Sequence, residues 1–275
     1  MKAIPEKDLV RFAEEAVELA TSGAELARDL MGSTRSHLKA DHSPVTEADM
    51  RIQDMIVRRL RRDFPSHGIL AEESSGLLST DELRREFVWA IDPIDGTRNF
   101  AAGIPIFTCS VGLLHAGMPV AGAVVMPEPR MIFSANASGP TLLNGKPISV
   151  SEQALSQTTV IALSASQYGS TPPYLQRWPG RRILRDFGSL AYHLALLSAG
   201  MIDAVVNLNG KLWDIAAGAL LVQQAGGRVI KLDDTGKPTH AALLPLAMSH
   251  YTRISVCLVA CSPAVGDELV SDMCQ

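Results

Sequence analysis

Two aspartates three residues apart, Asp92 and Asp95, are the residues of this sequence best placed to do chemistry. They stand in the segment WAIDPIDGTRNF, after an apolar run over 87–91 that predicts a buried strand. Pro93 and Gly96 predict a sharp turn that holds both carboxylates close together. Such carboxylates repel each other unless a cation lies between them, because a buried unpaired charge is costly. The spacing therefore indicates a divalent metal site, although Asp-Pro and Asp-Gly pairs are also typical of ordinary solvated turns.

Three further acids stand where they could complete such a site. Glu72, in the segment AEES, follows a short apolar run that predicts a strand, and it is a candidate ligand. Asp214, in LWDIAAG, precedes a helix rich in small residues, where the alternative role is an N-cap. Asp49 follows SPVTEA, where it could instead complement the dipole of a helix. Taken alone, the sequence leaves these alternatives open.

The segments AEES, WAIDPIDGTRNF and LWDIAAGALLVQQAGG, in this order and at these separations, resemble the inositol monophosphatase family of magnesium-dependent, lithium-sensitive phosphatases. The resemblance covers essentially the whole chain. It implies a layered α-β-α-β-α sandwich, a homodimer and two or three Mg²⁺ ions in each site. Magnesium prefers carboxylate, carbonyl and water oxygens, and no cluster of Cys and His at zinc spacing competes for the role.

The resemblance also implies a role for each matching residue. The implied ligands are Glu72, Asp92 and the backbone carbonyl of Ile94 for one ion, and Asp92, Asp95 and Asp214 for a second. Two metals close together can clamp the attacking and leaving oxygens of a displacement at phosphorus. The implied catalytic set is Asp49, Thr97 and Glu72. In it, Thr97 and Asp49 orient and deprotonate a water that attacks the phosphate directly.

The implied substrate contacts come from several segments. Gly96 lets a backbone N–H approach a phosphate oxygen, and Gly188-Ser189-Leu190 opens a helix whose free N–H groups suit an anion or a hydroxyl-rich ligand. Lys39, in a polar loop, could neutralise phosphate, although a solvated surface lysine fits equally. The complete implied set is Lys39, Ile94, Asp95, Gly96, Thr97, Gly188, Ser189, Leu190, Asn207 and Asp214.

Two of these positions depart from the family pattern. Leu190 replaces a small residue, which narrows the expected pocket. Asn207 stands where animal relatives carry a glutamate that accepts hydrogen bonds from inositol hydroxyls. An amide can still bond a hydroxyl, but it cannot form the stronger charge-assisted bond. The preference for inositol is therefore in question.

The expected activity is hydrolysis of inositol monophosphate or a related small sugar phosphate. Arg98-Asn99-Phe100 favours this branch, whereas residues 39–49 fit a nucleotidase branch equally well. The alternative substrates are 3'-phosphoadenosine-5'-phosphate, fructose 1,6-bisphosphate and histidinol phosphate. An alternative of another class is a regulatory protein that binds transcription machinery, as some bacterial relatives do. The retained acids favour the enzyme.

Composition fits a globular protein. The 275 residues are 47% hydrophobic, and 25 basic against 29 acidic residues give a net charge of -4, which predicts no direct nucleic-acid binding. Charges throughout the first 30 residues argue against a secretory signal, and no apolar run is long enough to span a bilayer. Four cysteines are expected as reduced thiols rather than disulfides. We expect a cytoplasmic protein.

Periodicity predicts an α/β chain in two halves. Helices are expected at about 6–31 and 46–63, then strands at 87–91, 108–115, 120–126 and 131–135 and a hairpin turn at 144–146. Beyond about residue 158, strands at 160–164, 204–208, 228–231 and 254–260 alternate with helices at 188–199 and 214–225. Such alternation favours a mainly parallel sheet. We predict an α+β half over 1–150 and an α/β half over 151–275, with the active site in the cleft between them.

Overall fold

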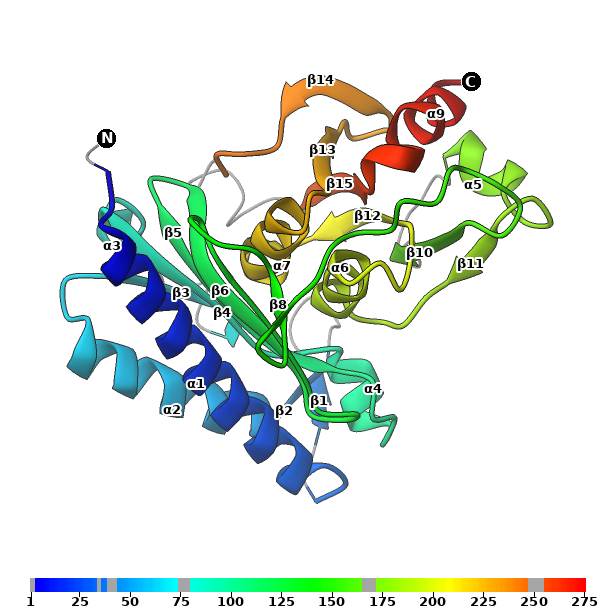
Figure 1. Ribbon diagram of the computed structural model, residues 1–275. Helices are drawn as coiled ribbons and strands as arrows, with labels where there is room; N and C mark the ends of the chain where they lie inside the picture. Colours follow the sequence, from blue (N-terminus) through cyan, green and yellow to red (C-terminus); the bar gives the residue numbers. More distant parts are fainter. Residues whose placement is uncertain (1–2, 34–35, 39–43, 74–79, 165–171, 247–254) are drawn as a thin grey trace.

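The chain folds into five stacked layers, in the order helices, sheet, helices, sheet, helices (Figure 1). The computed structural model describes residues 3–33, 36–38, 44–73, 80–164, 172–246 and 255–275. The layered α-β-α-β-α class expected from the sequence is confirmed. The division of the chain at residue 150 stays a prediction.

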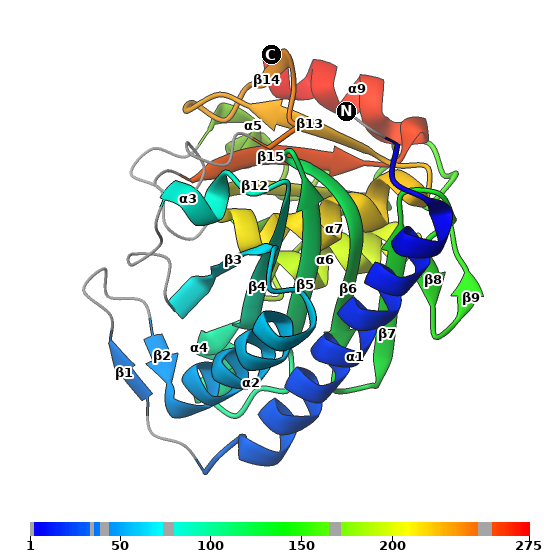
Figure 2. The ribbon, with the colours of Figure 1, turned by 90° about the vertical axis from the view of Figure 1, so that its left-hand side faces the viewer.

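The first two layers are a helix pair and a seven-stranded sheet. Helices α1 (Glu6–Leu30) and α2 (Glu47–Asp63) lie side by side across one face of this sheet (Figure 2). Strands β3 and β4 are parallel, and each later neighbour is antiparallel. In spatial order the strands are β3 (Gly68–Ala71), β4 (Phe87–Asp95), β5 (Thr108–His115), β6 (Met118–Met126), β7 (Met131–Asn136), β8 (Leu142–Leu143) and β9 (Lys146–Pro147).

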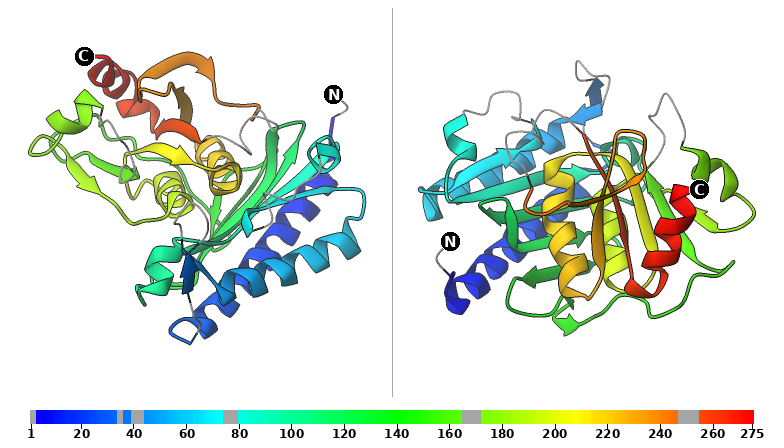
Figure 3. Two further views of the ribbon diagram at one scale, coloured as in Figure 1. Left: turned by 180° about the vertical axis from the view of Figure 1, so that it is seen from behind. Right: turned by 90° about the horizontal axis from the view of Figure 1, so that it is seen from above.

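The middle layer consists of α6 (Leu190–Ser198) and α7 (Leu212–Gln224), which lie between the two sheets. The outer helices α5 (Pro173–Arg177) and α9 (Pro263–Cys274) cover the far face of the second sheet (Figure 3). In spatial order this sheet contains β11 (Ile183–Arg185), β10 (Val160–Ser164), β12 (Ala204–Gly210), β15 (Val256–Cys261), β13 (Arg228–Leu232) and β14 (Pro238–Ala242). The remaining elements are β1 (Ser36–Leu38), β2 (Pro44–Thr46), α3 (Thr80–Leu83) and α4 (Thr97–Ala101).

The expectation of a mainly parallel second sheet is wrong. Only β11, β10 and β12 form parallel pairs, whereas β15 is antiparallel to both β12 and β13, and β14 is antiparallel to β13. A parallel pair needs a long crossover connection, usually through a helix. Residues 233–237, which join β13 to β14, are too few for one, so β14 returns antiparallel. The sheet is therefore mixed, with its parallel part next to α6.

Three apolar clusters hold the layers together. One joins α1 and α2 to the first sheet, a second surrounds α6 and α7 between the sheets, and a third lies under α5 and α9. Most of α7 is buried because it contacts both sheets, which explains why its sequence is apolar all round. Within the described residues, no helix has the length and apolarity needed to cross a membrane.

The close approach of α7 to β5 depends on a glycine. A Cβ added at Gly112 would lie 2.8 Å from Ala217 N and 3.0 Å from Ala216 Cβ, so the α7 backbone would have to move. We expect Gly112→Ala to lower the free energy of unfolding by about 2 kcal/mol, the usual size of an overpacking effect. Urea denaturation measures this change. Gly139→Ala is the matched control, because its nearest atom is Asn136 Oδ1 at 3.6 Å; an equal loss in both variants would contradict the packing argument.

Candidate active site

The strand that carries the aspartate pair runs further than predicted. β4 continues to Asp95 rather than ending at Ile91, because Asp95 still pairs with Thr108 of β5 after a register shift that begins at Asp92. A bulge of this kind accommodates Pro93, which has no N–H to give to the sheet. The bulge places both aspartates in the last four residues of β4, a buried strand with a neighbour on each side.

Hydrogen bonds fix the turn that follows. Ile94 N–H donates to Asp92 Oδ1 at 3.0 Å, and the Thr97 hydroxyl donates to Ile94 O at 3.0 Å. Gly96 has a φ of +106°, and a Cβ there would lie 3.1 Å from Ile106 O. Glycine is therefore required at this position, both for its conformation and for space.

Asp95 is held from the other side by the start of α6. Its Oδ2 accepts hydrogen bonds from the Ser189 hydroxyl at 2.8 Å and from Ala191 N–H at 2.6 Å. The Ser189 oxygen in turn accepts from Tyr192 N–H at 3.1 Å, so it is also the N-cap of α6. The hydroxyl of Ser189, expected to contact substrate, thus ties α6 to the carboxylate that ends β4.

Asp214 is not the N-cap of its helix, which is Lys211, but it still helps to cap the helix from its third position. Its role as a metal ligand stays a prediction. It lies in the first turn of α7, where its Oδ2 accepts a hydrogen bond from Lys211 N–H at 2.8 Å. It also shares a hydrogen bond with Asp92, and it lies close enough to Asp95 and Glu72 for their charges to raise its pKa. The cap therefore sets the direction in which this carboxyl joins the acidic group.

Asp49 likewise combines a helix cap with a place in the site. Its Oδ2 accepts from Thr46 N–H at 2.8 Å and from the Thr46 hydroxyl at 2.5 Å, which forms a capping box at the start of α2. Its Oδ1 faces the Thr97 hydroxyl at 3.4 Å. Burial raises the pKa of this carboxyl, whereas the hydrogen bonds from Thr46 oppose the rise.

The buried acids are charged only at a considerable cost. Burial, with the nearby charges of Glu72 and Asp95, raises the pKa of both Asp92 and Asp214 well above the usual value of 3.8. Burial raises the pKa of Asp95 to about 6, although the hydrogen bonds from Ala191 and Ser189 oppose it. These carboxyls therefore hold protons at mildly acidic pH, or they need a positive charge among them.

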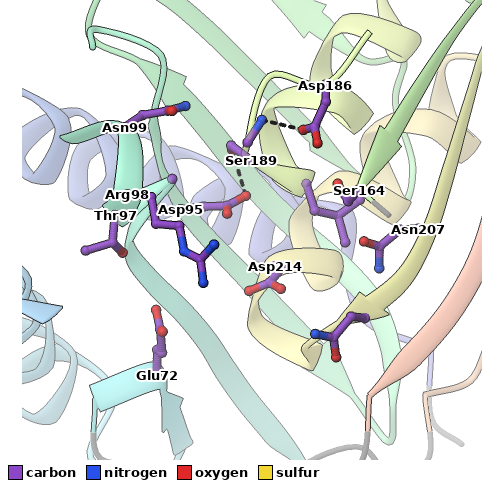
Figure 4. A pocket seen from close by; sticks show the side chains of 14 residues that line it. Glu72, Asp95, Thr97, Arg98, Asn99, Ser164, Asp186, Ser189, Asn207 and Asp214 are labelled. Carbon is purple, nitrogen blue, oxygen red and sulfur yellow. Dashed lines mark hydrogen bonds between the residues drawn. The ribbon is translucent and has the colours of Figure 1, made fainter. Parts of the chain in front are cut away.

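The predicted residues surround one cavity of about 310 Å³ (Figure 4). Asp92 and Ile94 are buried in β4 and are not among the residues that line the cavity, and Asp49 contacts the lining residue Thr97. Lys39 lies outside the described residues. The predicted residues that line the cavity are Glu72, Asp95, Gly96, Thr97, Gly188, Ser189, Leu190, Asn207 and Asp214.

Five further residues line the same cavity and were not predicted as site residues: Arg98, Asn99, Ser164, Asp186 and Asn209. Asn99 Nδ2 donates to Ile106 O and Phe187 O, both at 2.7 Å, and so joins α4 to the loop before α6. Ser164 ends β10, a strand whose bounds the sequence predicts. It could have been found from the tendency of α/β proteins to bind ligands at the carboxyl ends of parallel strands.

Comparison with known proteins decides the family. The sequence profile of the inositol monophosphatase family matches residues 8–260. The chain belongs to this family. Members of the family are phosphatases that hydrolyse phosphomonoesters, and the protein is a phosphatase of this kind.

Individual relatives support this assignment. Inositol monophosphatase 3 of Solanum lycopersicum is 35% identical over 232 residues, which cover 80% of this chain and 85% of that protein. A fructose-1,6-bisphosphatase/inositol-1-monophosphatase of Thermotoga maritima is 36% identical over 198 residues, or 72% of this chain and 74% of that protein. The solved structure of a Thermotoga maritima IMPase superposes with a TM-score of 0.80 at 29% identity, over 94% of this chain and 95% of that one.

The donors of this inositol monophosphatase family member fit a hard cation. Asp92, Asp95, Asp214 and Glu72 are oxygen donors, and burial makes charged carboxylates there unfavourable without a positive partner. Among the described residues, no three Asp, Glu, His or Cys side chains already converge as a preformed metal cage.

The raised pKa values predict how metal and protons compete. Because folding raises the pKa of Asp95 to about 6, its protonated carboxyl stabilises the metal-free fold at acid pH, and that contribution is lost as pH rises through about 6. Mg²⁺ binds the deprotonated carboxylates. The gain in melting temperature on replacing EDTA with Mg²⁺ should therefore increase between about pH 5 and about pH 8. Thermal melts at matched ionic strength measure it, and a gain independent of pH would contradict the competition.

Proposed function

We propose that the protein hydrolyses phosphate monoesters of small polyols or sugars in a Mg²⁺-dependent reaction, by direct attack of water on phosphorus. The observation that carries this proposal is that three of the four candidate metal-binding acids line one cavity together with Thr97, while Asp92 is buried against Asp214 and Asp49 faces Thr97. Glu72, Asp92, Asp95, Asp214 and the Ile94 carbonyl are the groups that would hold the metal. Bound Mg²⁺ would neutralise phosphate charge and make water more acidic.

The residues of the chain supply the path for the proton. The Thr97 hydroxyl has a single proton and two acceptors, Ile94 O at 3.0 Å and Asp49 Oδ1 at 3.4 Å. If the Ile94 carbonyl held the metal, the Thr97 hydroxyl would donate to Asp49 instead. The Thr97 oxygen could then accept a proton from the attacking water. Asp49 Oδ2 is already engaged by Thr46, which leaves Oδ1 as the basic oxygen. This arrangement fits general base catalysis through Thr97.

The experiment is an assay of phosphate release by the purified protein. The substrates are inositol 1-phosphate, fructose 1,6-bisphosphate, histidinol phosphate and 3'-phosphoadenosine-5'-phosphate, each with millimolar Mg²⁺ and with EDTA. We expect release that requires Mg²⁺ and is fastest with a sugar or polyol ester. Release that EDTA leaves unchanged would overturn the metal mechanism, and a strong preference for the nucleotide would overturn the substrate class.

Other properties implied by the family resemblance remain predictions. They are inhibition by lithium, two or three Mg²⁺ ions in each site, a homodimer, a cytoplasmic location and the absence of direct nucleic-acid binding. Lithium inhibition can be measured in the same assay, and light scattering measures the oligomeric state.

A further inference from the structure

Two polar side chains lie next to each other on the wall of the cavity formed by the second sheet. Ser164 and Asn207 are register partners on the parallel strands β10 and β12, where Ser164 ends β10 and Asn207 lies midway along β12. Paired residues of neighbouring strands point to the same face of a sheet. Both residues line the cavity, and Figure 4 shows them across it from Thr97 and Glu72. This wall therefore faces the part of the substrate that is remote from the metal-binding acids.

A buried histidine fixes the direction of the Ser164 hydrogen bond. Phe187 N–H donates to His193 Nε2 at 3.0 Å, and a backbone N–H can only donate, so Nε2 carries no proton. Burial lowers the pKa of His193 to about 3, which keeps the ring neutral. The ring proton is therefore on Nδ1, which lies 3.3 Å from Ser164 Oγ.

The Ser164 hydroxyl is consequently left as a donor. Its oxygen accepts from His193 Nδ1–H, and its own proton must point elsewhere. Ser164 lines the cavity, so the cavity is the place where that proton can find an acceptor. His193 is a positioning residue in this arrangement, because it acts on the substrate only through Ser164.

The side chain of Asn207, like that of Ser164, is oriented so that a hydrogen-bond donor is left over. With its carboxamide oxygen toward the last residues of β12, it accepts from Gly210 N–H at 2.5 Å and from Asn209 N–H at 3.2 Å. The opposite orientation makes one bond of 3.4 Å to Val256 O and leaves both backbone donors facing an NH₂ group. The first orientation is therefore favoured. The NH₂ group of Asn207 then lies on the side away from these two N–H groups, and it too can only donate.

We propose that Ser164 and Asn207 form a donor wall that binds the alcohol moiety of the substrate and favours an anionic or carbonyl oxygen over a hydroxyl oxygen. An oxygen of the favoured kind belongs to a second phosphate, a carboxylate or a carbonyl group. This deepens the proposed function and rests on it. A carboxylate at position 207 would accept hydrogen bonds from hydroxyls, whereas this wall gives hydrogen bonds, and donation to an anionic oxygen is the stronger kind.

The test compares three substrates in wild type and Ser164→Ala. Fructose 1,6-bisphosphate carries a second phosphate, inositol 1-phosphate carries only hydroxyls, and phenyl phosphate carries no second oxygen group. We expect Ser164→Ala to lower kcat/KM about tenfold for the bisphosphate, mainly through KM, and to leave phenyl phosphate unchanged. Ser198→Ala is the matched control, because its hydroxyl bonds Ala195 O within α6 and does not line the cavity.

Two outcomes separate this inference from the proposed function. If the wild type hydrolyses none of the three esters, the proposed function itself fails. If it hydrolyses phenyl phosphate but Ser164→Ala changes all three substrates equally, or none of them, only the donor wall is overturned.

Nitrogen NMR of His193 tests, without any measurement of turnover, whether His193 donates its hydrogen bond to Ser164. We expect a neutral ring with its proton on Nδ1, and a Nδ1 resonance that moves in Ser164→Ala. A proton on Nε2, or a ring that titrates near the usual pKa of 6.5, would overturn the assignment.

Discussion

Replacing Asp92 with asparagine is expected to abolish phosphate release and at the same time to stabilise the metal-free protein. Asp92 is the acid expected to serve both ions, so Asp92→Asn should lower kcat by about 10³-fold or more in Mg²⁺. Its carboxyl is buried beside Asp214, Asp95 and Glu72, and burial already raises its pKa. A neutral amide removes that unfavourable charge, so the melting temperature in EDTA should rise at neutral pH.

The control for this prediction is Asp234→Asn, the same chemical change at an exposed position. It should leave both turnover and melting temperature unchanged. A rise in melting temperature without loss of turnover would show that Asp92 is buried next to the site but takes no part in it. If Asp92→Asn lost turnover and yet kept the cellular phenotype, the regulatory alternative would describe the biological role better.

Elements whose pattern is local were predictable from the sequence. The apolar periodicity of residues 6–31 and 46–63 predicts α1 and α2 to within a residue at each end, and 108–115 and 160–164 match β5 and β10. The Asn144-Gly145 turn gives the hairpin of β8 and β9. Short elements such as α3, α4 and β11 were not predicted, because a few residues do not show a period.

Features that depend on contacts between distant segments were not predictable. The insertion of β15 between β12 and β13 makes the second sheet mixed, and nothing in the segment 256–261 specifies its neighbours. The hydrogen bond from Ser189 to Asp95 joins residues 94 positions apart. The sequence predicts Ser189 only as a substrate contact, whereas in the structure it also orients the Asp95 carboxylate. The orientation of the Asn207 carboxamide likewise depends on a register shift at the end of β12, where the N–H groups of Asn209 and Gly210 point at its oxygen.

Two acids of the candidate site also cap helices. Asp49 and Asp214 both sit in the first turn of a helix and accept a backbone N–H there. The sequence presented the cap and the site as competing interpretations, yet each carboxyl has two oxygens and can serve both. One oxygen fixes the orientation of the side chain, and the other faces the site, so the caps supply preorganisation.

Asp49 uses one oxygen for the helix cap and the other for Thr97, so a large loss of activity is also expected when Thr97 is replaced. Thr97→Ala removes the hydroxyl that links Asp49 to the attacking water, so kcat should fall about 100-fold with little change in KM. Thr97→Ser keeps the hydroxyl and should stay within about threefold of wild type. Steady-state kinetics with the preferred ester measures both variants, and equal activity of Thr97→Ala and Thr97→Ser would contradict the relay.

Asp49→Asn should also lose most of its activity, because it interrupts the same proton transfer. The two donors of Thr46 hold an oxygen at the Oδ2 position, so the amide would turn its NH₂ group toward Thr97, and that group cannot accept a proton. Helix α2 keeps its cap, and the melting temperature should change little. Because Thr97 and Asp49 act as one unit, the double variant should be no slower than the slower of the two single variants. Multiplicative losses would show instead that the two side chains act independently.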